Sequence, residues 1–418
     1  MPLSFILRRC FLIVLLILPQ RFWIGRGWKL SGRLKDRRLR FLIKSFLTVA
    51  VVMMALVLYD RISQKIFPDR LSGWVAPIVQ LWIFTSTFTF LCEQLLRLIF
   101  WLGRRLHRLF KRAGGTPEDA SRRSALRYAA LLLRASPFMA AVYGYAVERL
   151  RFEVVRVDVP IANLSRELDG LRIVQLSDIH AGDLLPMPEI RRAVRIAQGL
   201  DAHLAVITGD FVSGYGDPLE ACIAELSLLK APLGTWGCNG NHEIYAGVED
   251  AAERLFQQHG MRLLRHSSAQ ISWQGAAFNL IGVDYQHDVQ LTGSKLPSLR
   301  GVDALVRRDM PNILLSHNPN TFHRAAEEGI ELSLAGHTHG GQVTIEILHR
   351  SWNPAKFMTP FIAGLYELPM PAGSNDKTAG KARLYVNRGI GTLGVPARLG
   401  APPEITLLTL RSDKSSSS

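Results

Sequence analysis

The stretch "LSLAGHTHGGQ", Leu332–Gln342, is an apolar run that stops at a glycine and then presents two histidines one residue apart. A short apolar run that ends in this way is typical of a buried β-strand. The two histidines are either surface residues on a glycine-rich turn, or one half of a metal site whose other half lies earlier in the chain.

Earlier predicted strands also run directly into side chains that can bind a metal. The strands are Leu171–Leu176, Leu204–Ile207, Gly234–Cys238, Asn312–Leu315 and Leu332–Ala335. The side chains that follow them, in the same order, are Asp178 and His180, then Asp210, then Asn241 and His242, then His317, and finally His337 and His339. Between the strands, Pro188–Gly199 and Val248–His259 have helical periodicity. The alternation predicts an α/β domain over most of Arg151–Arg411, with the five strand ends at one edge of the sheet, where open α/β folds bind ligands.

These side chains suit a particular chemistry. Mixed carboxylate and imidazole ligands favour Mn, Fe or Zn over calcium. Two such metals, about 3.5–4 Å apart, supply both the nucleophile and the positive charge that hydrolysis of a phosphate ester requires near neutral pH. Glycines precede Asp210, Asn241 and His337, and we expect them to allow tight turns that aim these side chains inward.

The ordered pattern D-x-H, GD, GNH[DE], H and GHxH, spread over Leu171–Gly341, resembles that of the calcineurin-like metallophosphoesterase superfamily. The resemblance implies a sandwich of two β-sheets flanked by helices, with two divalent metal ions. It implies that Asp178, His180 and His339 hold the first metal, that Asn241, His317 and His337 hold the second, and that Asp210 bridges both. The catalytic His242 would donate a proton to the leaving oxygen or stabilise its charge, while a metal-bridging hydroxide attacks phosphorus in line.

One position departs from the family pattern. Many relatives read GDxxD, and the second aspartate orients the catalytic histidine, but this chain reads "GDFVS" with Ser213 at that place. Either another group orients His242, or the role of His242 is weaker here. We interpret Glu243, which completes the GNHE motif, as a supporting or capping carboxylate.

A second resemblance lies near the C-terminus. The stretch "YVNRGIGTLGVPARLGAPPEI", Tyr385–Ile405, is similar to the signature of a bacterial branch of membrane-attached or exported metallophosphoesterases. Its Arg388 and Arg398 are candidates for contacting the substrate phosphate, and the alternative is that they brace the glycine-rich loops. We expect the loops Asp284–Pro297 and Glu346–Asp376 to shape the substrate pocket.

The first part of the chain differs in composition from the rest. Residues 1–150 hold 25 Lys and Arg against 7 Asp and Glu, a charge of +18, whereas residues 151–418 carry −3. Three apolar stretches, Phe41–Tyr59, Val75–Trp101 and Ala125–Val147, approach the roughly 20 residues that cross a bilayer. Leu3–Gly25 is a fourth candidate, which equally suits an uncleaved signal-like start.

The predicted organisation therefore has three parts: residues 1–150 form a membrane region with three or four transmembrane helices, residues 151–411 form the calcineurin-like domain, and residues 412–418 form a disordered tail. Eight Lys and Arg lie in Arg21–Arg40 and seven in Arg104–Arg123, against three in Asp60–Trp74. By the positive-inside rule, the two basic loops are cytoplasmic. We expect a multi-pass protein of the cell's inner or plasma membrane with an extracytoplasmic catalytic domain.

These features predict a membrane-anchored dinuclear-metal phosphohydrolase that cleaves phosphoester or pyrophosphate bonds of lipid-linked or envelope substrates. The first alternative is a UDP-2,3-diacylglucosamine diphosphatase of lipid A synthesis, but that enzyme should face the cytoplasm. An alternative of another class is a catalytically weak membrane scaffold or sensor, yet no ligand of the motif is missing. The −3 charge of the catalytic part argues against nucleic acid as a partner, and the sequence does not predict the oligomeric state.

Overall fold

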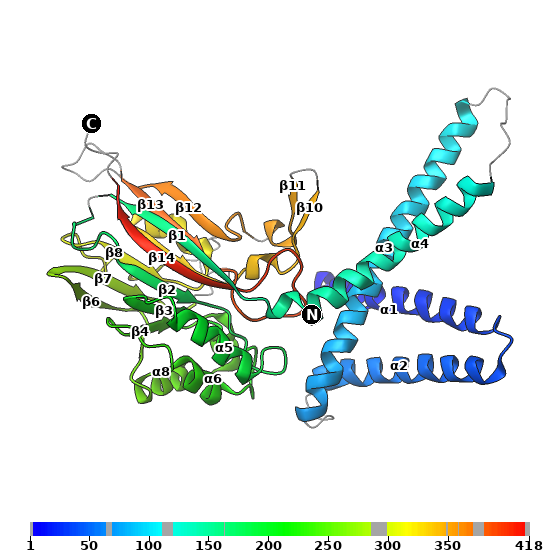
Figure 1. Cartoon of the computed structure of the whole chain (residues 1–418), viewed down its shortest axis with the longest axis horizontal. Coiled ribbons are helices and arrows are strands. Elements are labelled where there is room, and N and C mark those ends of the chain that lie inside the picture. Colours follow the sequence, from blue (N-terminus) through cyan, green and yellow to red (C-terminus); the bar gives the residue numbers. More distant parts are fainter. Residues whose placement is uncertain are drawn as a thin grey trace. The chain divides into compact units, whose positions relative to one another are not determined.

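The structure is a computed structural model that describes residues 3–63, 69–110, 120–162, 164–285, 299–347, 350–357, 359–370 and 380–413. The chain divides into two compact units, Met1–Gly144 and Tyr145–Ser418 (Figure 1). The last residues of the predicted tail, 414–418, lie outside the described part, while Ser412 is the final residue of strand β14 (Glu404–Ser412).

The first unit is helical. Its helices are α1 (Leu3–Ser31), α2 (Arg37–Ser63), α3 (Asp69–Phe110) and α4, which begins at Ala120 and ends at Ala146. Within the described residues, two stretches are long and apolar enough to cross a membrane, Arg37–Leu56 and Pro77–Gly103, and they overlap two of the predicted spans. Most side chains of a third predicted span, Leu3–Gly25, lie outside the described part, and the described residues of the fourth, Ala125–Val147, do not meet this criterion.

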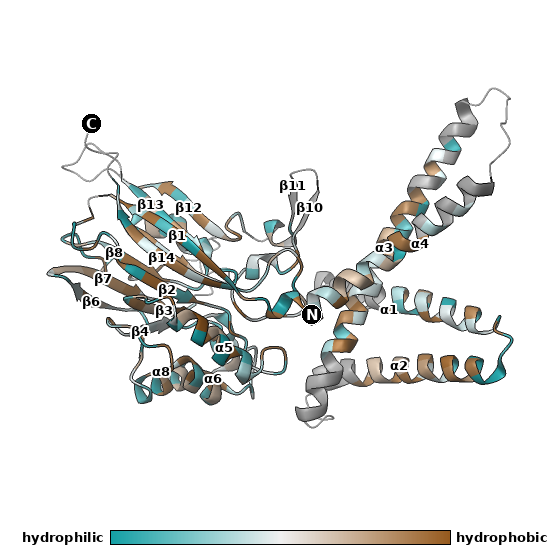
Figure 2. Cartoon of the chain, in the orientation of Figure 1, coloured by the Kyte–Doolittle hydropathy of each residue, from teal (hydrophilic) through white to brown (hydrophobic). Residues whose placement is uncertain are grey.

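The apolar side chains of these two stretches are mostly not covered by protein. Only 6% of the α2 window and 31% of the α3 window are buried, and Figure 2 shows apolar residues along both helices. The core helix of a soluble protein would instead bury its apolar face. The exposure therefore favours helices that face lipid.

The second unit, Tyr145–Ser418, is a sandwich of two six-stranded sheets flanked by helices (Figure 1). The first sheet has the order β1-β14-β2-β3-β4-β5 and the second has the order β12-β13-β9-β8-β7-β6. The strands not yet delimited are β1 (Glu153–Ile161), β2 (Arg172–Leu176), β3 (Leu204–Thr208), β4 (Thr235–Cys238), β5 (Arg262–Leu263), β6 (Ser267–Trp273), β7 (Ala276–Gly282), β8 (Asn312–Leu315), β9 (Leu332–Ala335), β12 (Gly364–Pro369) and β13 (Lys381–Val386). A separate hairpin pairs β10 (Ile345–Ile347) with β11 (Arg350–Trp352). The helices are α5 (Met187–Gln198), α6 (Leu219–Leu226), α7 (Asn241–Ala246), α8 (Glu249–Gln258) and α9 (Phe322–Glu327).

All five predicted strands are present, and the two-sheet sandwich implied by the family resemblance is confirmed. The expectation that the five strand ends share one edge of one sheet is wrong. Strands β2, β3 and β4 belong to the first sheet, and β8 and β9 belong to the second. An apolar run shows that a strand is buried, but it does not encode which strand is its hydrogen-bonded neighbour.

Alternate residues of a central strand face two different cores. In β3, Leu204 and Val206 join the core between the sheets, where β8 and β9 supply the opposite side. Ala205 and Ile207 of the same strand face the helices α5, α6 and α8. Burial on both faces explains why these strands are continuous apolar runs rather than alternating ones.

A buried polar contact joins the two sheets near the ends of their strands. The side-chain amide of Gln175, in β2, donates to the hydroxyl of Thr208 in β3 and to the carbonyl of Ala335 in β9, both at 3.0 Å. A buried amide without partners would be costly, so this contact favours one alignment of the two sheets. The loops after β2, β3 and β9 consequently start from the same region.

Candidate active site

The loops that follow β2, β3, β4, β8 and β9 bring predicted ligands together from both sheets. Three groups of side chains each have their ligand atoms within 4.8 Å of one another. They are Asp178, His180 and His339, then Asp210, His317 and His337, then His180, Asp210 and His242. The first group has the composition predicted for the first metal, and the second has that of the second metal apart from Asn241. Asp210 occurs in the second and third groups, and the third group shares His180 with the first.

The distances between these atoms suit a bound cation. The Nε2 atoms of His180 and His339 are 3.1 Å apart, and His339 Nε2 is 3.3 Å from Asp178 Oδ1. His317 Nε2 lies 3.0 Å from Asp210 Oδ2. Several atoms with lone pairs therefore face one another in a buried space, which a divalent metal would stabilise.

Two buried polar atoms at the same place also fit a metal. His317 Nδ1 lies 2.6 Å from the carbonyl oxygen of Thr208 and donates to it, so Nε2 is the ring nitrogen that faces the other predicted ligands. Within the described residues, Asn241 Oδ1 is buried and makes no hydrogen bond, and the buried Nε2 of His317 faces the carboxylates of Asp210 at 3.0 Å and Asp178 at 4.0 Å. Buried polar atoms are almost always partnered, so these two are suited to coordinate a cation.

The backbone of the site is strained. Asp178, His180, Asp210, His337 and His339 have φ angles between 48° and 76°, in the left-handed region. Such a conformation costs on the order of 1–3 kcal/mol for a residue with a side chain and persists where the surrounding structure imposes it. Nine non-glycine residues of the described part have positive φ, so these five are more than half of them. The concentration of strain marks the strand ends as a functional site.

Glycines in the motifs allow the loops to approach one another closely. A Cβ atom on Gly336 would overlap Ser177 Oγ and Asp178 Oδ2. Gly209 has a φ of 84°, and a Cβ atom there would lie 2.5 Å from the nitrogen of Gly240. The predicted tight turn at Gly209 is therefore present, whereas Gly336 is required by contact between loops.

The orientation of His242 comes from a main-chain carbonyl. His242 Nδ1 donates to the carbonyl oxygen of Ser213 at 2.6 Å, which leaves Nε2 for chemistry. The hydroxyl of Ser213 lies 3.1 Å from Nδ1 of His180. Asp217 fixes this turn, because its Oδ2 accepts from the nitrogens of Ser213 at 2.7 Å and Gly214 at 2.9 Å. The residue that departs from the family pattern thus contacts two histidines of the site.

Glu243 braces the loop that carries Asp210. Its carboxylate accepts hydrogen bonds from the backbone nitrogens of Asp210 at 2.9 Å, Phe211 at 2.7 Å and Gly240 at 2.8 Å. The interpretation of Glu243 as a capping carboxylate is confirmed, since it is the third residue of α7 and caps that helix. Burial, assisted by the charge of Asp210, raises the pKa of Glu243 to about 7.

Burial decides the protonation of most of the histidines. It lowers the pKa of His180 to about 3 and of His337 to about 4, and it lowers the pKa of His339 well below the ordinary value. Burial opposes the charged form of His317 too, but the carboxylate of Asp210 outweighs it and raises the pKa of His317 to about 10. Three of the four imidazoles are therefore neutral near pH 7, the form that binds metals.

Arg388 and Arg398 contact other protein groups. Arg388 donates to Glu404 at 2.5 Å and to Glu153 at 3.1 Å. Arg398 is fully buried, and all its guanidinium nitrogens donate to main-chain carbonyls. The accepting residues are His339, Arg388, Gly389, Gly391 and Ala401. Burial lowers the pKa of Arg398 to about 9. These contacts agree with the loop-bracing alternative, and a phosphate contact by either arginine stays a prediction.

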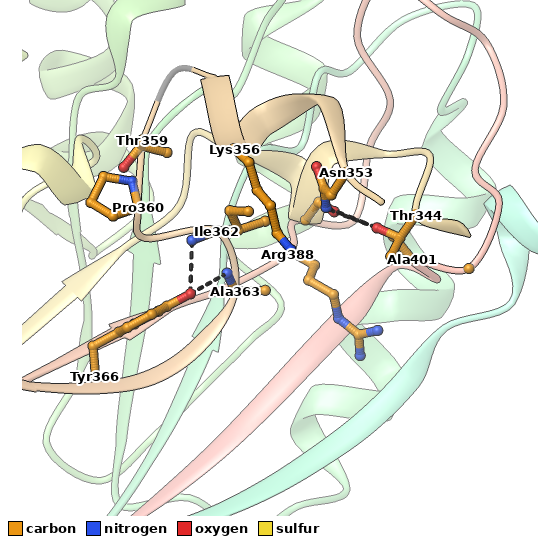
Figure 3. Close-up of a pocket in the computed structure, with 12 residues that line it drawn as sticks. Thr344, Asn353, Lys356, Thr359, Pro360, Ile362, Ala363, Tyr366, Arg388 and Ala401 are labelled. Atoms are coloured by element: carbon orange, nitrogen blue, oxygen red, sulfur yellow. Dashed lines mark hydrogen bonds between the residues drawn. The ribbon is translucent and has the colours of Figure 1, made fainter. Parts of the chain in front are cut away.

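A cavity of about 590 Å³ lies beside the loop that carries His339 (Figure 3). Gly340, the residue after His339, lines it together with Lys356, Tyr366 and Arg388. Several other lining residues, including Asn353 and Thr359, belong to the loop that we expect to shape the pocket. Most of the other such loop, residues 286–297, lies outside the described part.

Two tyrosines beside the site were not anticipated from the sequence. The ring of Tyr245 lies 5.6 Å from that of His242, and the ring of Tyr285 lies 5.7 Å from that of His337. Burial raises the pKa of Tyr285 to about 12, so its hydroxyl stays protonated and can donate a hydrogen bond. Tyr245 could be found from its spacing, three residues after His242 on the same helix, but Tyr285 belongs to no motif.

Known proteins share these features. The calcineurin-like phosphoesterase family matches residues 171–341. A transmembrane protein with metallophosphoesterase domain from Bos taurus is 31% identical over 339 residues, covering 77% of this chain and 70% of that protein. The protein of the same name from Danio rerio is 29% identical over 321 residues, which cover 75% of this chain and 69% of that protein. The UDP-2,3-diacylglucosamine pyrophosphatase LpxG of Chlamydia muridarum is 24% identical over 314 residues, which cover 66% of this chain and 94% of that protein. The chain therefore belongs to the calcineurin-like phosphoesterase family and is a metal-dependent phosphoric ester hydrolase.

Proposed function

We propose that this chain is a membrane-anchored phosphohydrolase that binds two divalent metals and cleaves phosphoester or pyrophosphate bonds. The observation that supports the proposal is the set of three overlapping ligand groups, of which two share Asp210 and two share His180. In the proposal, Asp178, His180 and His339 would hold one metal, Asn241, His317 and His337 would hold the other, and Asp210 would bind both. The mixture of nitrogen and oxygen ligands suits Mn, Fe or Zn.

The protein's own contribution to the reaction centres on His242. Two bound metals would supply positive charge for the phosphoryl oxygens and a nucleophile derived from water. The hydrogen bond from His242 Nδ1 to Ser213 fixes the tautomer and the ring, so that Nε2 can protonate the leaving oxygen or stabilise its charge. Glu243 keeps the Asp210 loop in place through main-chain hydrogen bonds.

The substrate that fits best is lipid-linked or belongs to the cell envelope. The apolar helices of residues 1–150 would place the catalytic domain, residues 151–411, next to a membrane. The distribution of Lys and Arg between the loops supports a multi-pass arrangement with that domain outside the cytoplasm. The similarity to the diacylglucosamine pyrophosphatase supports a second candidate, hydrolysis of the pyrophosphate in UDP-2,3-diacylglucosamine, for which the domain should instead face the cytoplasm.

A substrate panel tests the proposal. The full chain, purified in detergent micelles with Mn, Zn or Mg, is offered an aryl phosphate monoester, an aryl phosphodiester and UDP-2,3-diacylglucosamine. We expect metal-dependent turnover, and the preferred substrate separates the two candidates. Absence of turnover on every substrate, in protein with two bound metals, would contradict the proposal and favour a scaffold or sensor.

Topology needs a separate experiment. Alkaline phosphatase, which is active only outside the cytoplasm, is fused after the last residue of the chain. The proposal predicts an active fusion. An inactive fusion that is expressed at the same level would contradict the outward orientation and favour the UDP-2,3-diacylglucosamine candidate.

A further inference from the structure

A cluster of charged side chains lies in the helical unit, Met1–Gly144, which contains none of the predicted metal ligands. The carboxylate of Glu93, in α3, is 4% exposed and is surrounded by arginines. Its Oε1 lies 3.0 Å from Arg26 of α1 and 2.5 Å from Arg97 of α3, and its Oε2 lies 3.5 Å from Arg134 of α4. Three helices thus converge on one carboxylate, and we name these four residues the arginine cluster.

The arginine cluster has an unbalanced positive charge. Three guanidinium groups against one carboxylate leave a net charge of +2. The other acidic side chain described in this unit, Asp36, accepts hydrogen bonds from the backbone nitrogens of Arg38 and Leu39 instead. Like charges close together among apolar helices are costly unless an anion compensates them. The cluster is therefore suited to bind an anion.

The arginines keep hydrogen-bond donors on the surface. The side chains of Arg26, Arg97 and Arg134 are 42%, 52% and 43% exposed, although each lies next to Glu93. The ring of Phe22 lies 5.6 Å from the guanidinium of Arg26 and 5.2 Å from that of Arg97. These contacts limit the orientations of both guanidinium groups. Planar guanidinium groups in a fixed arrangement match the oxygens of a phosphate.

The surroundings of the cluster suit a lipid rather than a soluble anion. Leu95 and Leu98 of α3 are 57% and 50% exposed, and Leu131 and Leu133 of α4 are 60% and 55% exposed. Arg97 lies six residues before the end of the apolar stretch Pro77–Gly103, a rise of about 9 Å at 1.5 Å per residue. An arginine at that depth reaches the headgroup region with its long side chain.

We propose that the arginine cluster binds the phosphate of an anionic phospholipid, whose acyl chains lie against the exposed leucines of α3 and α4. Basic groups between transmembrane helices are a recognised way of binding phospholipid headgroups. Glu93 acts as the internal counter-ion that keeps the three guanidinium groups together. The proposal rests on the membrane association of the helices, and it does not depend on the chemistry at the metal ligands.

Lipid binding to the full chain in detergent micelles tests the proposal. Native mass spectrometry measures the apparent Kd for phosphatidylglycerol, with phosphatidylcholine as the reference lipid. The variants are Arg26→Gln and Arg134→Gln, and the matched control is Arg21→Gln, an exposed arginine of α1 with the same change of charge. We expect tighter binding of phosphatidylglycerol than of phosphatidylcholine. Each cluster variant should weaken that binding about fivefold, while the control stays within about twofold.

A further variant separates lipid binding from a structural role. Glu93→Gln raises the positive charge of the cluster, so phosphatidylglycerol binding should stay equal or become tighter. A purely structural ion cluster predicts the same loss for Glu93→Gln as for the arginine variants, and that result would overturn the proposal. Equal binding of the two lipids, or displacement of the lipid by millimolar glycerol 3-phosphate, would overturn it as well. If Glu93→Gln does not fold, the phosphatidylglycerol affinities of Arg26→Gln and Arg21→Gln still test the proposal, because equal affinities would overturn it.

Discussion

Replacing Arg398 by lysine tests whether this arginine braces the site or contacts the substrate. The guanidinium of Arg398 is fully buried and donates hydrogen bonds to the main-chain carbonyls of five residues. An ammonium group offers three donors, so at least two of those carbonyls would lose their partner. Each buried carbonyl left unpartnered costs about 1–3 kcal/mol, so the variant should lose about 2–6 kcal/mol of stability.

Thermal unfolding of the full chain, followed by tryptophan fluorescence with metal present, measures this loss. For a domain of this size, it corresponds to a fall in Tm on the order of 10 °C. The matched control is Arg411→Lys, because Arg411 is 49% exposed and pairs with Asp158 on the surface. The control should stay within about 0.5 kcal/mol of the wild type. If Arg398→Lys melts like the control while its KM for an aryl phosphate rises tenfold, the guanidinium contacts substrate and the bracing account is wrong.

Three further substitutions test the positioning of the site. Ser213→Ala removes the hydroxyl beside His180, and we expect metal affinity to fall about 10–100-fold, measured by titration with Mn or Zn; unchanged affinity would contradict this role. Asp217→Ala frees the turn whose carbonyl holds His242, so kcat at saturating metal should fall about tenfold with KM unchanged, and an unaltered kcat would argue against it. Gly336→Ala would force a methyl group into the loop after β2, so the bound metals per chain should fall below two; full metal content in elemental analysis would refute the close contact.

The sequence predicts which side chains lie close together at the site, because each of them follows a buried strand. Apolar runs locate β2, β3, β4, β8 and β9 correctly, and His, Asp or Asn after a strand end identifies a residue that can coordinate metal. The division of these strands between two sheets was not predicted from the runs, because pairing depends on contacts between distant segments. The ligand roles stay predictions, while their closeness in space is a property of the fold.

Other features of the site could not be predicted from residue types. Every residue has a carbonyl, so nothing in the sequence indicates that the carbonyl of Ser213 binds His242. The sequence shows the charge of Arg398 but not its burial, which depends on loops that fold around it. The sequence places Glu93 and Arg97 four residues apart in one apolar stretch, but it does not show that Arg26 and Arg134, from helices far apart in sequence, lie beside the same carboxylate.

In our proposal, the cluster of side chains around Asp210 binds two metals that are required for hydrolysis. The most direct test compares the full chain with Asp210→Asn, and with Asp303→Asn as an exposed control, in metal content per chain and in turnover of the preferred substrate. We predict two metals per chain and metal-dependent turnover for the wild type and the control, with turnover at least about 100-fold lower and fewer bound metals for Asp210→Asn. Turnover by Asp210→Asn equal to that of the control would contradict the account.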